Sequence, residues 1–218
     1  KVFAQSKEDK NRLEELGATN VEVIGNIKLA VLPKVTKELE KPNEFLITAG
    51  STHENEEELI LEGYEKSLGK LVIVPRHPER FDKVDLLIKE FIKNKELTYH
   101  RYSTQEDFSS DIILVDKMGE LINILAISDA VILGGAFEKI GGHNPIEPAA
   151  FGCAIISGKH YFNQKALFEC VKNYTIVEND ELKDIMKNIK KLEKSTLLSI
   201  GSVEPILNEI KRASNGNR

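Results

Sequence analysis

A glycine-rich stretch, residues 134–152, contains the residue types best suited to hold a ligand. It follows the apolar run 129–133, which has the length and branching of a buried strand, so its first glycines mark the point where the chain leaves a sheet. The glycines at 141 and 142 add backbone without Cβ atoms, which allows a ligand to approach the main chain closely. The stretch therefore predicts a ligand-binding loop at a sheet edge.

The second half of this stretch is typical of the start of a helix. Asn144 has the residue type of an N-cap, and Pro145 suits the first helical position because its missing N–H is not needed there. Glu147 then falls in the first turn, where its carboxylate can accept hydrogen bonds from the hydroxyls of a sugar. The alternative is a plain strand–loop–helix connection, but such connections usually have only about 2 to 6 residues.

Three other expected strands also end in polar or charged residues, at 51–53, 75–77 and 118–120. Arg76 lies between two prolines and offers a fixed charge that can grip a phosphate or a carboxylate with two hydrogen bonds. Its alternative role is a surface ion pair with a neighbouring Glu. Gly119, at an expected helix start, can donate N–H groups to an anion or a base edge, or it can simply begin the helix.

Histidines at 53, 77 and 143 lie beside these strand ends and invite a catalytic interpretation. Histidine serves as a base or a metal ligand, yet single histidines are more often packing or hydrogen-bonding residues, and we favour that role for all three. Their spacing lacks the i, i+4 pair of a helical zinc site.

Several common nucleotide motifs are missing. The sequence contains no G-x-x-x-x-G-K-[ST] loop, and no G-x-G-x-x-G follows the first strand, which argues against kinase, ATPase and dehydrogenase functions. It also has no Asp-x-Asp pair to hold a metal-bound diphosphate. We therefore expect a site without a metal or a cofactor, formed by helix starts and Arg76.

Strand and helix patterns alternate along the chain, which predicts an α/β fold: a parallel sheet covered on both faces by right-handed crossovers. The carboxyl ends of parallel strands lie along one edge, where ligands of such sheets bind, so the residue groups above should converge. The expected strands are 21–24, 45–49, 71–74, 97–99, 112–115, 130–133, 154–156 and 174–177, and the expected helices are 6–16, 59–68, 80–93, 118–128, 145–151, 164–172, 180–194 and 200–211.

The bulk properties fit an ordinary globular protein. The chain has 218 residues, 41% hydrophobic and 30% charged, and a formal net charge of -5, which argues against nonspecific nucleic-acid binding. No membrane-spanning stretch or signal peptide is recognisable, so we expect a cytoplasmic location. The two cysteines are too few for a disulfide framework or a zinc site and are expected to be buried thiols.

Four sequence blocks together resemble one enzyme family. Gly50-Ser-Thr-His53, Val74-Pro-Arg-His-Pro-Glu-Arg-Phe81, Met118-Gly-Glu-Leu121 and Gly141-Gly-His-Asn-Pro-Ile-Glu-Pro-Ala-Ala150 occur in this order. They are similar to the signature blocks of the Kdo transferases, which attach 3-deoxy-D-manno-octulosonic acid (Kdo) during lipopolysaccharide synthesis. The resemblance extends from about Ala4 to beyond Asn163.

The resemblance implies a fold and a set of ligand contacts. Members of the family are GT-B glycosyltransferases whose Rossmann-like C-terminal half binds the donor, CMP-Kdo, and they transfer Kdo with inversion and without an Asp-x-Asp metal. Glu147 is then expected at the ribose, Arg76 and the 118–120 turn at the nucleotide, and Ser51, more weakly, at the phosphate or sugar carboxylate. The implied CMP contacts are Pro75, Arg76, Met118, Gly119, Glu120, Asn144, Pro145, Ile146 and Glu147.

The resemblance also implies what lies outside this sequence. The chain begins at Lys1 and not at Met, and the family's N-terminal half, with its membrane-proximal segment, lipid A precursor site and catalytic Glu, has no counterpart here. We therefore expect a donor-binding fragment without catalytic residues, taken from an enzyme on the cytoplasmic face of the bacterial inner membrane. The expected divisions are an N-terminal remnant at 1–27, a linker at 28–43 and the CMP-Kdo domain at 44–218.

Two alternatives remain open from the sequence. One is another GT-B nucleotide-sugar enzyme, a UDP-sugar transferase or an epimerase, which base selectivity would distinguish. The other is a complete, non-catalytic nucleotide-binding module.

Overall fold

The computed structural model describes residues 1–25, 27, 32–198 and 203–215. The chain divides into two compact units, one formed by residues 1–32 and 197–218 and the other by residues 33–196. Each unit is considered by itself. Among the described residues, no helix combines the length and the apolar character needed to cross a membrane.

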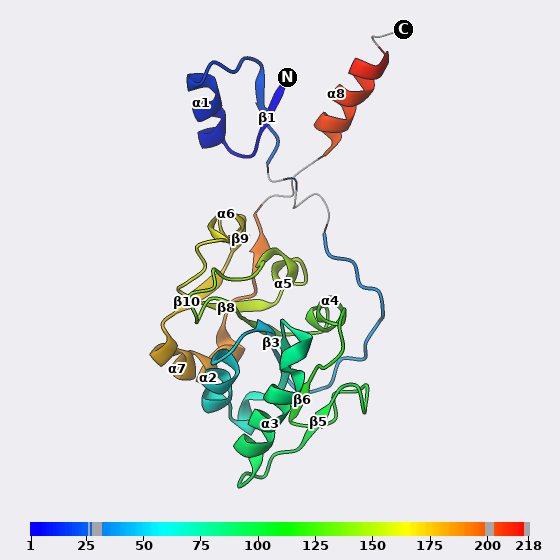
Figure 1. Ribbon diagram of the computed structural model, residues 1–218, viewed down its shortest axis with the longest axis vertical. Helices are drawn as coiled ribbons and strands as arrows, with labels where there is room; N and C mark the ends of the chain where they lie inside the picture. Colours follow the sequence, from blue (N-terminus) through cyan, green and yellow to red (C-terminus); the bar gives the residue numbers. More distant parts are fainter. Residues whose placement is uncertain (26, 28–31, 199–202, 216–218) are drawn as a thin grey trace. The chain divides into compact units, whose positions relative to one another are not determined.

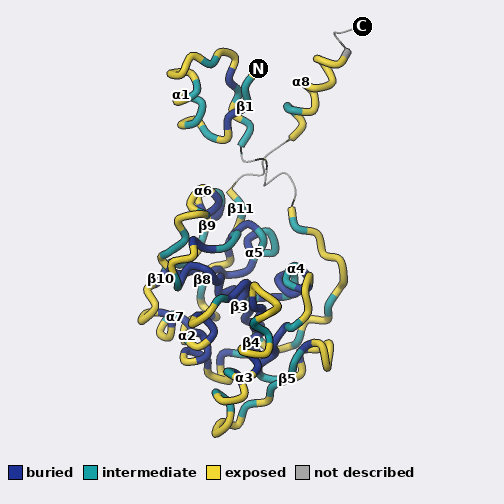
Figure 2. Tube along the Cα trace, in the orientation of Figure 1, coloured by how far each residue is buried: buried dark blue, intermediate teal, exposed yellow. Residues whose placement is uncertain are grey.

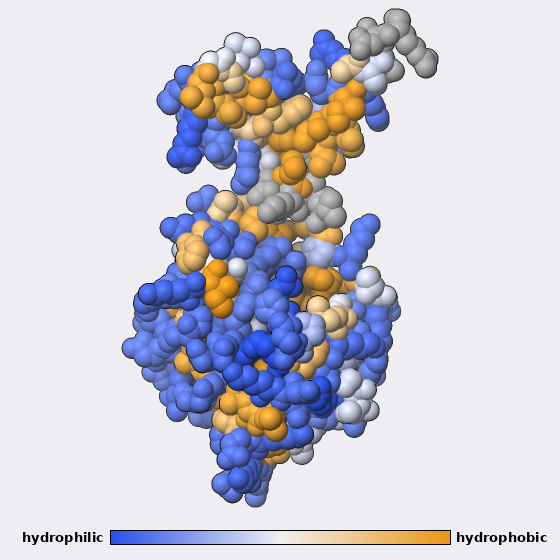
Figure 3. Space-filling model, in the orientation of Figure 1, coloured by the Kyte–Doolittle hydropathy of each residue, from blue (hydrophilic) through white to orange (hydrophobic). Residues whose placement is uncertain are grey.

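The smaller unit contains a short strand–helix–strand motif. Strands β1 (Val2–Ala4) and β2 (Val21–Val23) pair in parallel, and α1 (Lys7–Glu15) connects them. Ser6 caps this helix as predicted, because its Oγ accepts a hydrogen bond of 3.0 Å from the backbone N–H of Asp9. The last helix, α8 (Glu204–Asn215), belongs to the same unit, and apolar side chains gather along it (Figure 3).

The larger unit is built on one seven-stranded sheet with the order β10-β8-β7-β3-β4-β6-β5 (Figure 1). All six pairings are parallel, which confirms the predicted sheet. Its strands are β3 (Leu46–Thr52), β4 (Lys70–Pro75), β5 (Tyr99–Arg101), β6 (Ile112–Leu114), β7 (Ala130–Leu133), β8 (Ala154–Gly158) and β10 (Tyr174–Val177).

Helices cover both faces of this sheet and bury its side chains (Figure 2). One face packs against α2 (Glu56–Gly63), α3 (Phe81–Ile92) and α7 (Leu182–Lys187), which contribute to the larger apolar core. On the other side lie α4 (Leu121–Leu125) and α5 (Ile146–Ala150), and Ile124 of α4 joins a second apolar core with Leu46 and Val72 of the sheet. Because both faces are covered, β3 and β4 are buried along their whole length.

Several elements differ from the sequence prediction. The helix expected at 180–194 is broken into 3-10 turns at Asn179–Glu181 and Ile189–Lys191 on either side of α7. The helix expected at 164–172 is reduced to α6 (Lys165–Phe168), and β9 (Val171–Lys172) follows it and pairs with β11 (Thr196–Leu197). These two short strands and β1 were not predicted.

The predicted domain boundaries are not tested by the structure and stay a prediction. The expected linker at 28–43 and the expected start of the last helix at 200 fall partly outside the described residues. The division into compact units groups residues 197–218 with the N-terminal segment, whereas the sequence prediction assigned them to the donor domain.

Candidate functional site

The order of the strands creates a switch point beside β3. After β3 the chain forms β4 beside it, then β5 at the edge of the sheet and β6 between β4 and β5. It then crosses to β7 on the other side of β3 and continues to β8 and β10. Ligands of open parallel sheets bind outside the carboxyl ends of the strands at such a reversal. The topology therefore places a binding crevice beyond Ser51 and Leu133.

A cavity of about 230 Å³ lies at this switch point. Its apolar wall comes from α4, β7 and the first residues of α5, and its polar wall comes from the loops that follow the strands. The apolar residues are Leu121, Leu125, Val131, Leu133 and Pro148. The polar residues are Ser51, Arg76, His143, Asn144, Glu147 and Gln164.

Larger cavities lie elsewhere in the same unit, but they lack this combination. One of about 460 Å³ lies beside Glu44 and Lys70, at the amino ends of β3 and β4. Another, of about 590 Å³, lies beside α2, α3 and α7. We place the candidate site at the smaller cavity because it lies at the switch point and gathers residues from four separate strand ends.

Asn144 and Glu147 form one polar side of the cavity. Asn144 Oδ1 accepts a hydrogen bond of 3.0 Å from the N–H of Ile146, and Asn144 Nδ2 donates to Glu147 Oε1 at 3.2 Å. Burial raises the pKa of Glu147, while the bond from Asn144 and the charge of Arg76 act in the opposite direction. The helix α5 begins at Ile146, one residue later than predicted, and Pro145 precedes it in a helical conformation. The hydrogen bond from Ile146 to Asn144 is nevertheless the one expected of an N-cap asparagine.

Arg76 faces Glu147 and His143 from the end of β4. Its positive charge adds to the burial that lowers the pKa of His143 and opposes the burial that raises the pKa of Glu147. Its backbone N–H donates to the carbonyl of Thr52 at 3.0 Å, which fixes the turn, but within the described part of the chain its guanidinium forms no ion pair. Among the described residues, Arg76 thus does not form the surface ion pair that the sequence left open as its alternative role. An uncommitted guanidinium at the mouth of a cavity is suited to an anionic ligand.

The three histidines meet beside this cavity. His53 Nε2 and His143 Nε2 are 2.8 Å apart, so one ring donates a hydrogen bond to the other, and the ring of His77 lies 5.4 Å from that of His53. Burial lowers the pKa of His53, and burial with the neighbouring His53, Arg76 and His77 lowers that of His143 to about 4. The pair is therefore neutral near pH 7. Among the described residues, no group of three or more His, Cys, Asp or Glu side chains is arranged to hold a metal ion.

Comparison with known proteins identifies the family. No family model matches the sequence. A bifunctional glycosyltransferase/methyltransferase of Fusobacterium nucleatum is 34% identical over 96% of this chain and 37% of its own length. A 3-deoxy-D-manno-octulosonic acid transferase of Haemophilus influenzae is 36% identical over 77% of this chain and 42% of its own length. The chain thus spans about two fifths of these relatives.

A solved structure covers a larger share of its own length. The crystal structure of the C-terminal CMP-Kdo binding domain of WaaA from Acinetobacter baumannii is 31% identical, covers 68% of this chain and 81% of its own, and superimposes with a TM-score of 0.58. The chain belongs to the Kdo transferase family. The expected fold class is confirmed with it: a Rossmann-like α/β sheet of the kind that forms the C-terminal half of a GT-B glycosyltransferase.

The resemblance to Kdo transferases implies a set of CMP contacts, and only some of these residues lie in the cavity wall. Arg76, Asn144, Glu147 and the weaker candidate Ser51 line it. The remaining residues support the wall or lie beside it, and their contacts with CMP stay predictions. Pro75 and Ile146 are buried, Pro145 precedes α5, and Met118, Gly119 and Glu120 form the turn before α4.

The side chains of the 118–120 turn are not arranged as a preformed nucleotide site. Met118 is 59% exposed, and Gly119 has a φ of +88° with open space around it. Glu120 is buried and accepts a hydrogen bond of 3.1 Å from Asn123 Nδ2, so its carboxylate is turned toward α4. The turn therefore presents backbone groups to its surroundings more than the Glu120 side chain.

Gln164 was missed by the sequence analysis. It lines the cavity from the loop after β8, and its Nε2 donates to the carbonyl of Gly142 at 3.3 Å. It belongs to no motif, but it follows a strand of the same sheet, so the rule that ligands bind at carboxyl strand ends could have identified it. The cavity thus collects residues from the end of β3 and from the loops after β4, β7 and β8.

Proposed function

We propose that this chain is the CMP-Kdo-binding domain of a glycosyltransferase that transfers Kdo to a lipid A precursor, with inversion and without an Asp-x-Asp metal. The observation that carries the proposal is the cavity at the switch point, where Arg76 and Glu147 face each other in a fold similar to the CMP-Kdo binding domain of WaaA. Because the chain spans 42% of its Haemophilus influenzae relative, the acceptor and the full reaction are part of this proposal.

Each polar residue of the cavity has a role in the proposed complex. Glu147 accepts hydrogen bonds from the ribose hydroxyls. Arg76 pairs with the phosphate, and its positive charge also offsets the negative charge of Glu147. Ser51, at the end of β3, is a weaker candidate for the phosphate or the sugar carboxylate. The backbone of the 118–120 turn contacts the base, and the apolar wall beside Leu121 excludes water from these bonds.

In this proposal the chain binds its donor but does not turn it over by itself. The catalytic Glu of the family, its acceptor site and its membrane contact belong to the N-terminal half, and the complete enzyme works at the cytoplasmic face of the inner membrane. The described residues provide a nucleotide pocket without a group assigned to catalysis. Mixing the chain with CMP-Kdo and a lipid A precursor should therefore give no Kdo transfer.

Titration calorimetry with CMP tests the binding half of the proposal. CMP should bind with measurable affinity, and UMP should bind more weakly, because a cytosine-specific site offers polar groups that uracil cannot satisfy equally. Absence of heat at millimolar CMP would contradict the proposal. Equal affinities for CMP and UMP would favour another nucleotide-sugar enzyme of the GT-B class.

Two substitutions test the assigned roles. Arg76→Ala and Glu147→Ala each remove charge-assisted hydrogen bonds worth roughly 1.5–3 kcal/mol, so each should weaken CMP binding by about ten- to a hundredfold. Glu79→Ala is the matched control, because Glu79 is an exposed charge just after the Arg76 turn and its side chain is 75% accessible. If both cavity variants bind CMP as the parent does, the assignment is wrong.

A further inference from the structure

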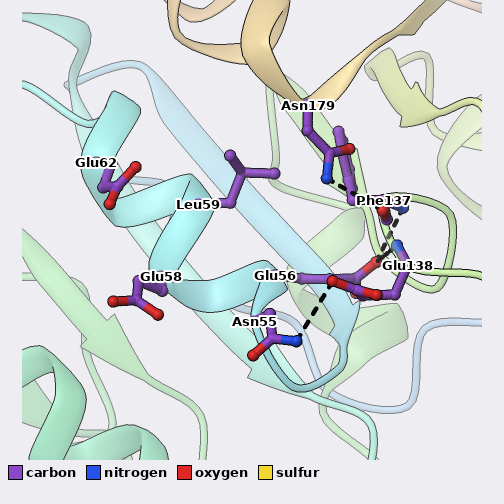
Figure 4. A pocket seen from close by; sticks show the side chains of 8 residues that line it. All are labelled: Asn55, Glu56, Glu58, Leu59, Glu62, Phe137, Glu138 and Asn179. Carbon is purple, nitrogen blue, oxygen red and sulfur yellow. Dashed lines mark hydrogen bonds between the residues drawn. The ribbon is translucent and has the colours of Figure 1, made fainter.

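The side chain of Glu56 is a buried carboxylate that the nucleotide contacts do not use. It lies at the start of α2 with no solvent exposure. Its two oxygens accept four backbone N–H bonds: from Gly135 at 2.8 Å, His53 at 2.9 Å, Phe137 at 3.1 Å and Glu138 at 3.4 Å. Figure 4 shows this carboxylate beside Phe137 and Glu138. One side chain thus joins the loop after β3 to the loop after β7.

The first glycines of the 134–152 stretch are required by this contact. A Cβ on Gly134 would lie 2.8 Å from Glu56 Oε2 and 2.5 Å from the carbonyl oxygen of Ser51. Gly135 has a φ of +75°, a conformation that side chains disfavour. These two glycines therefore serve the approach of the loop to Glu56, in addition to ending the strand as the sequence predicted.

Neighbouring side chains hold the same loop from its outer side. Asn179 Nδ2 donates to the carbonyl of Phe137 at 3.2 Å, and Asn55 Nδ2 donates to Glu138 Oε1 at 3.4 Å (Figure 4). These four residues and Glu56 line a cavity of about 220 Å³ that is separate from the nucleotide cavity. The loop is therefore held by contacts that lie outside the nucleotide cavity.

A short path leads from Glu56 to the nucleotide cavity. Gly135 donates its N–H to Glu56, and its carbonyl accepts a hydrogen bond of 2.7 Å from the N–H of Gly142. Gly142 directly precedes His143 and Asn144, which line the cavity. His143 also packs against Gly135, since a Cβ there would lie 2.8 Å from His143 Cδ2.

We propose that Glu56 is a positioning residue for the nucleotide cavity: its carboxylate fixes the loop at 135–138 and, through Gly135 and Gly142, the placement of His143 and Asn144. The inference rests on the proposed function, because it takes the cavity to be the CMP site. It assigns to Glu56 an effect on affinity without any contact with the ligand.

Two opposing effects set the stability of a Glu56→Gln variant. Burial raises the pKa of Glu56, and the four N–H donors only partly oppose this, so keeping the charge inside the protein works against folding. Replacing the carboxylate by an amide removes that penalty. The amide keeps one oxygen acceptor but turns an NH₂ group toward two backbone N–H donors, which frees part of the loop. We therefore expect weaker binding. The N–H groups left without an acceptor lower the stability, and the removed penalty offsets part of that loss.

Calorimetry with CMP on Glu56→Gln tests the inference, with Glu58→Gln as the matched control. Glu58 lies in the same first turn of α2 but is exposed. Glu56→Gln should bind CMP about tenfold more weakly under conditions where its urea curve shows it to be fully folded, and Glu58→Gln should match the parent in affinity and in urea midpoint. Unchanged affinity in Glu56→Gln, or equal losses in the two variants, would overturn the inference.

Two further measurements keep the test decisive. If Glu56→Gln fails to fold, Asn179→Ala takes its place, because it removes only the outer bond to Phe137, and it should weaken CMP binding two- to threefold. Amide hydrogen exchange without CMP should be faster at Phe137 and Glu138 in Glu56→Gln than in the parent. If the parent does not bind CMP, the proposed function fails, and if exchange at these amides is unchanged, the positioning role fails.

Discussion

The buried ion pair between Glu57 and Arg80 leads to a sharp prediction about stability. Arg80 donates two hydrogen bonds to the Glu57 carboxylate, at 2.6 and 2.9 Å, and Thr52 Oγ1 donates a third at 2.7 Å. The side chains are only 16% and 1% accessible for Arg80 and Glu57. The bond to Glu57 is the main reason that the pKa of Arg80 is raised. This pair ties the start of α2 to the turn after β4.

The substitution Arg80→Met should destabilise the protein strongly. It leaves the Glu57 carboxylate buried with the hydroxyl of Thr52 as its remaining donor among these contacts. Removing one partner of a buried pair typically costs about 3–5 kcal/mol of stability. Because Arg80 is partly exposed, we expect the loss to be about 3 kcal/mol. Urea unfolding followed by far-UV circular dichroism measures it, because the chain has no Trp. The m-value should stay unchanged.

Lys83→Met is the matched control for this experiment. Lys83 forms an ion pair with Glu54 in the same region, but both side chains are 64% accessible, so its loss should have little effect on stability. The double variant Glu57→Leu with Arg80→Met should recover much of the loss, since it removes the unpaired charge. If Arg80→Met is no more destabilising than Lys83→Met, the reasoning is refuted.

Three further predictions concern the nucleotide cavity and the cysteines. Gly135→Ala places a Cβ 2.8 Å from His143 Cδ2 at a φ of +75°, so calorimetry should show weakened CMP binding. In an NMR titration His143 should stay neutral down to about pH 4, since burial lowers its pKa from 6.5 to about 4. Its contribution to stability is then present above about pH 6.5 and is lost as the pH falls toward 4. A titration midpoint near 6.5 would contradict this. Iodoacetamide should label Cys170 before Cys153, whose pKa burial raises to about 12, and mass spectrometry showing equal labelling would contradict it.

The sheet and much of the cavity were predictable because their signals are local. The apolar runs located β3, β4, β6 and β7 along the chain, and the residues after these strands gave Arg76 and Glu147 as neighbours. Once strands are known to be parallel, their carboxyl ends must share one edge, so residues distant in sequence can be placed together without any knowledge of packing.

Other features depend on distant partners and left no local signal. The strand β1 has only three residues and exists through its pairing with Val21–Val23. The contact of Glu56 with Gly135 joins residues 79 positions apart, and a Glu in a helix start looks the same in sequence whether it is buried or exposed. The sequence placed the glycines at 134 and 135 at the end of a strand, but it gave no sign that their backbone serves Glu56.

The place of β3 in the sheet has a consequence for how the protein folds. Residues 46–114 contain β3, β4, β5 and β6, four adjacent strands, whereas β7 begins only at Ala130 and pairs with the other edge of β3. The first half of the sheet is thus complete in sequence before its second half has been synthesised, and the β3–β7 contact closes a long loop. The cavity is lined by residues of both β3 and β7. A ligand that binds there stabilises only the joined sheet, so under the proposed function CMP binding would report that β3 and β7 have paired.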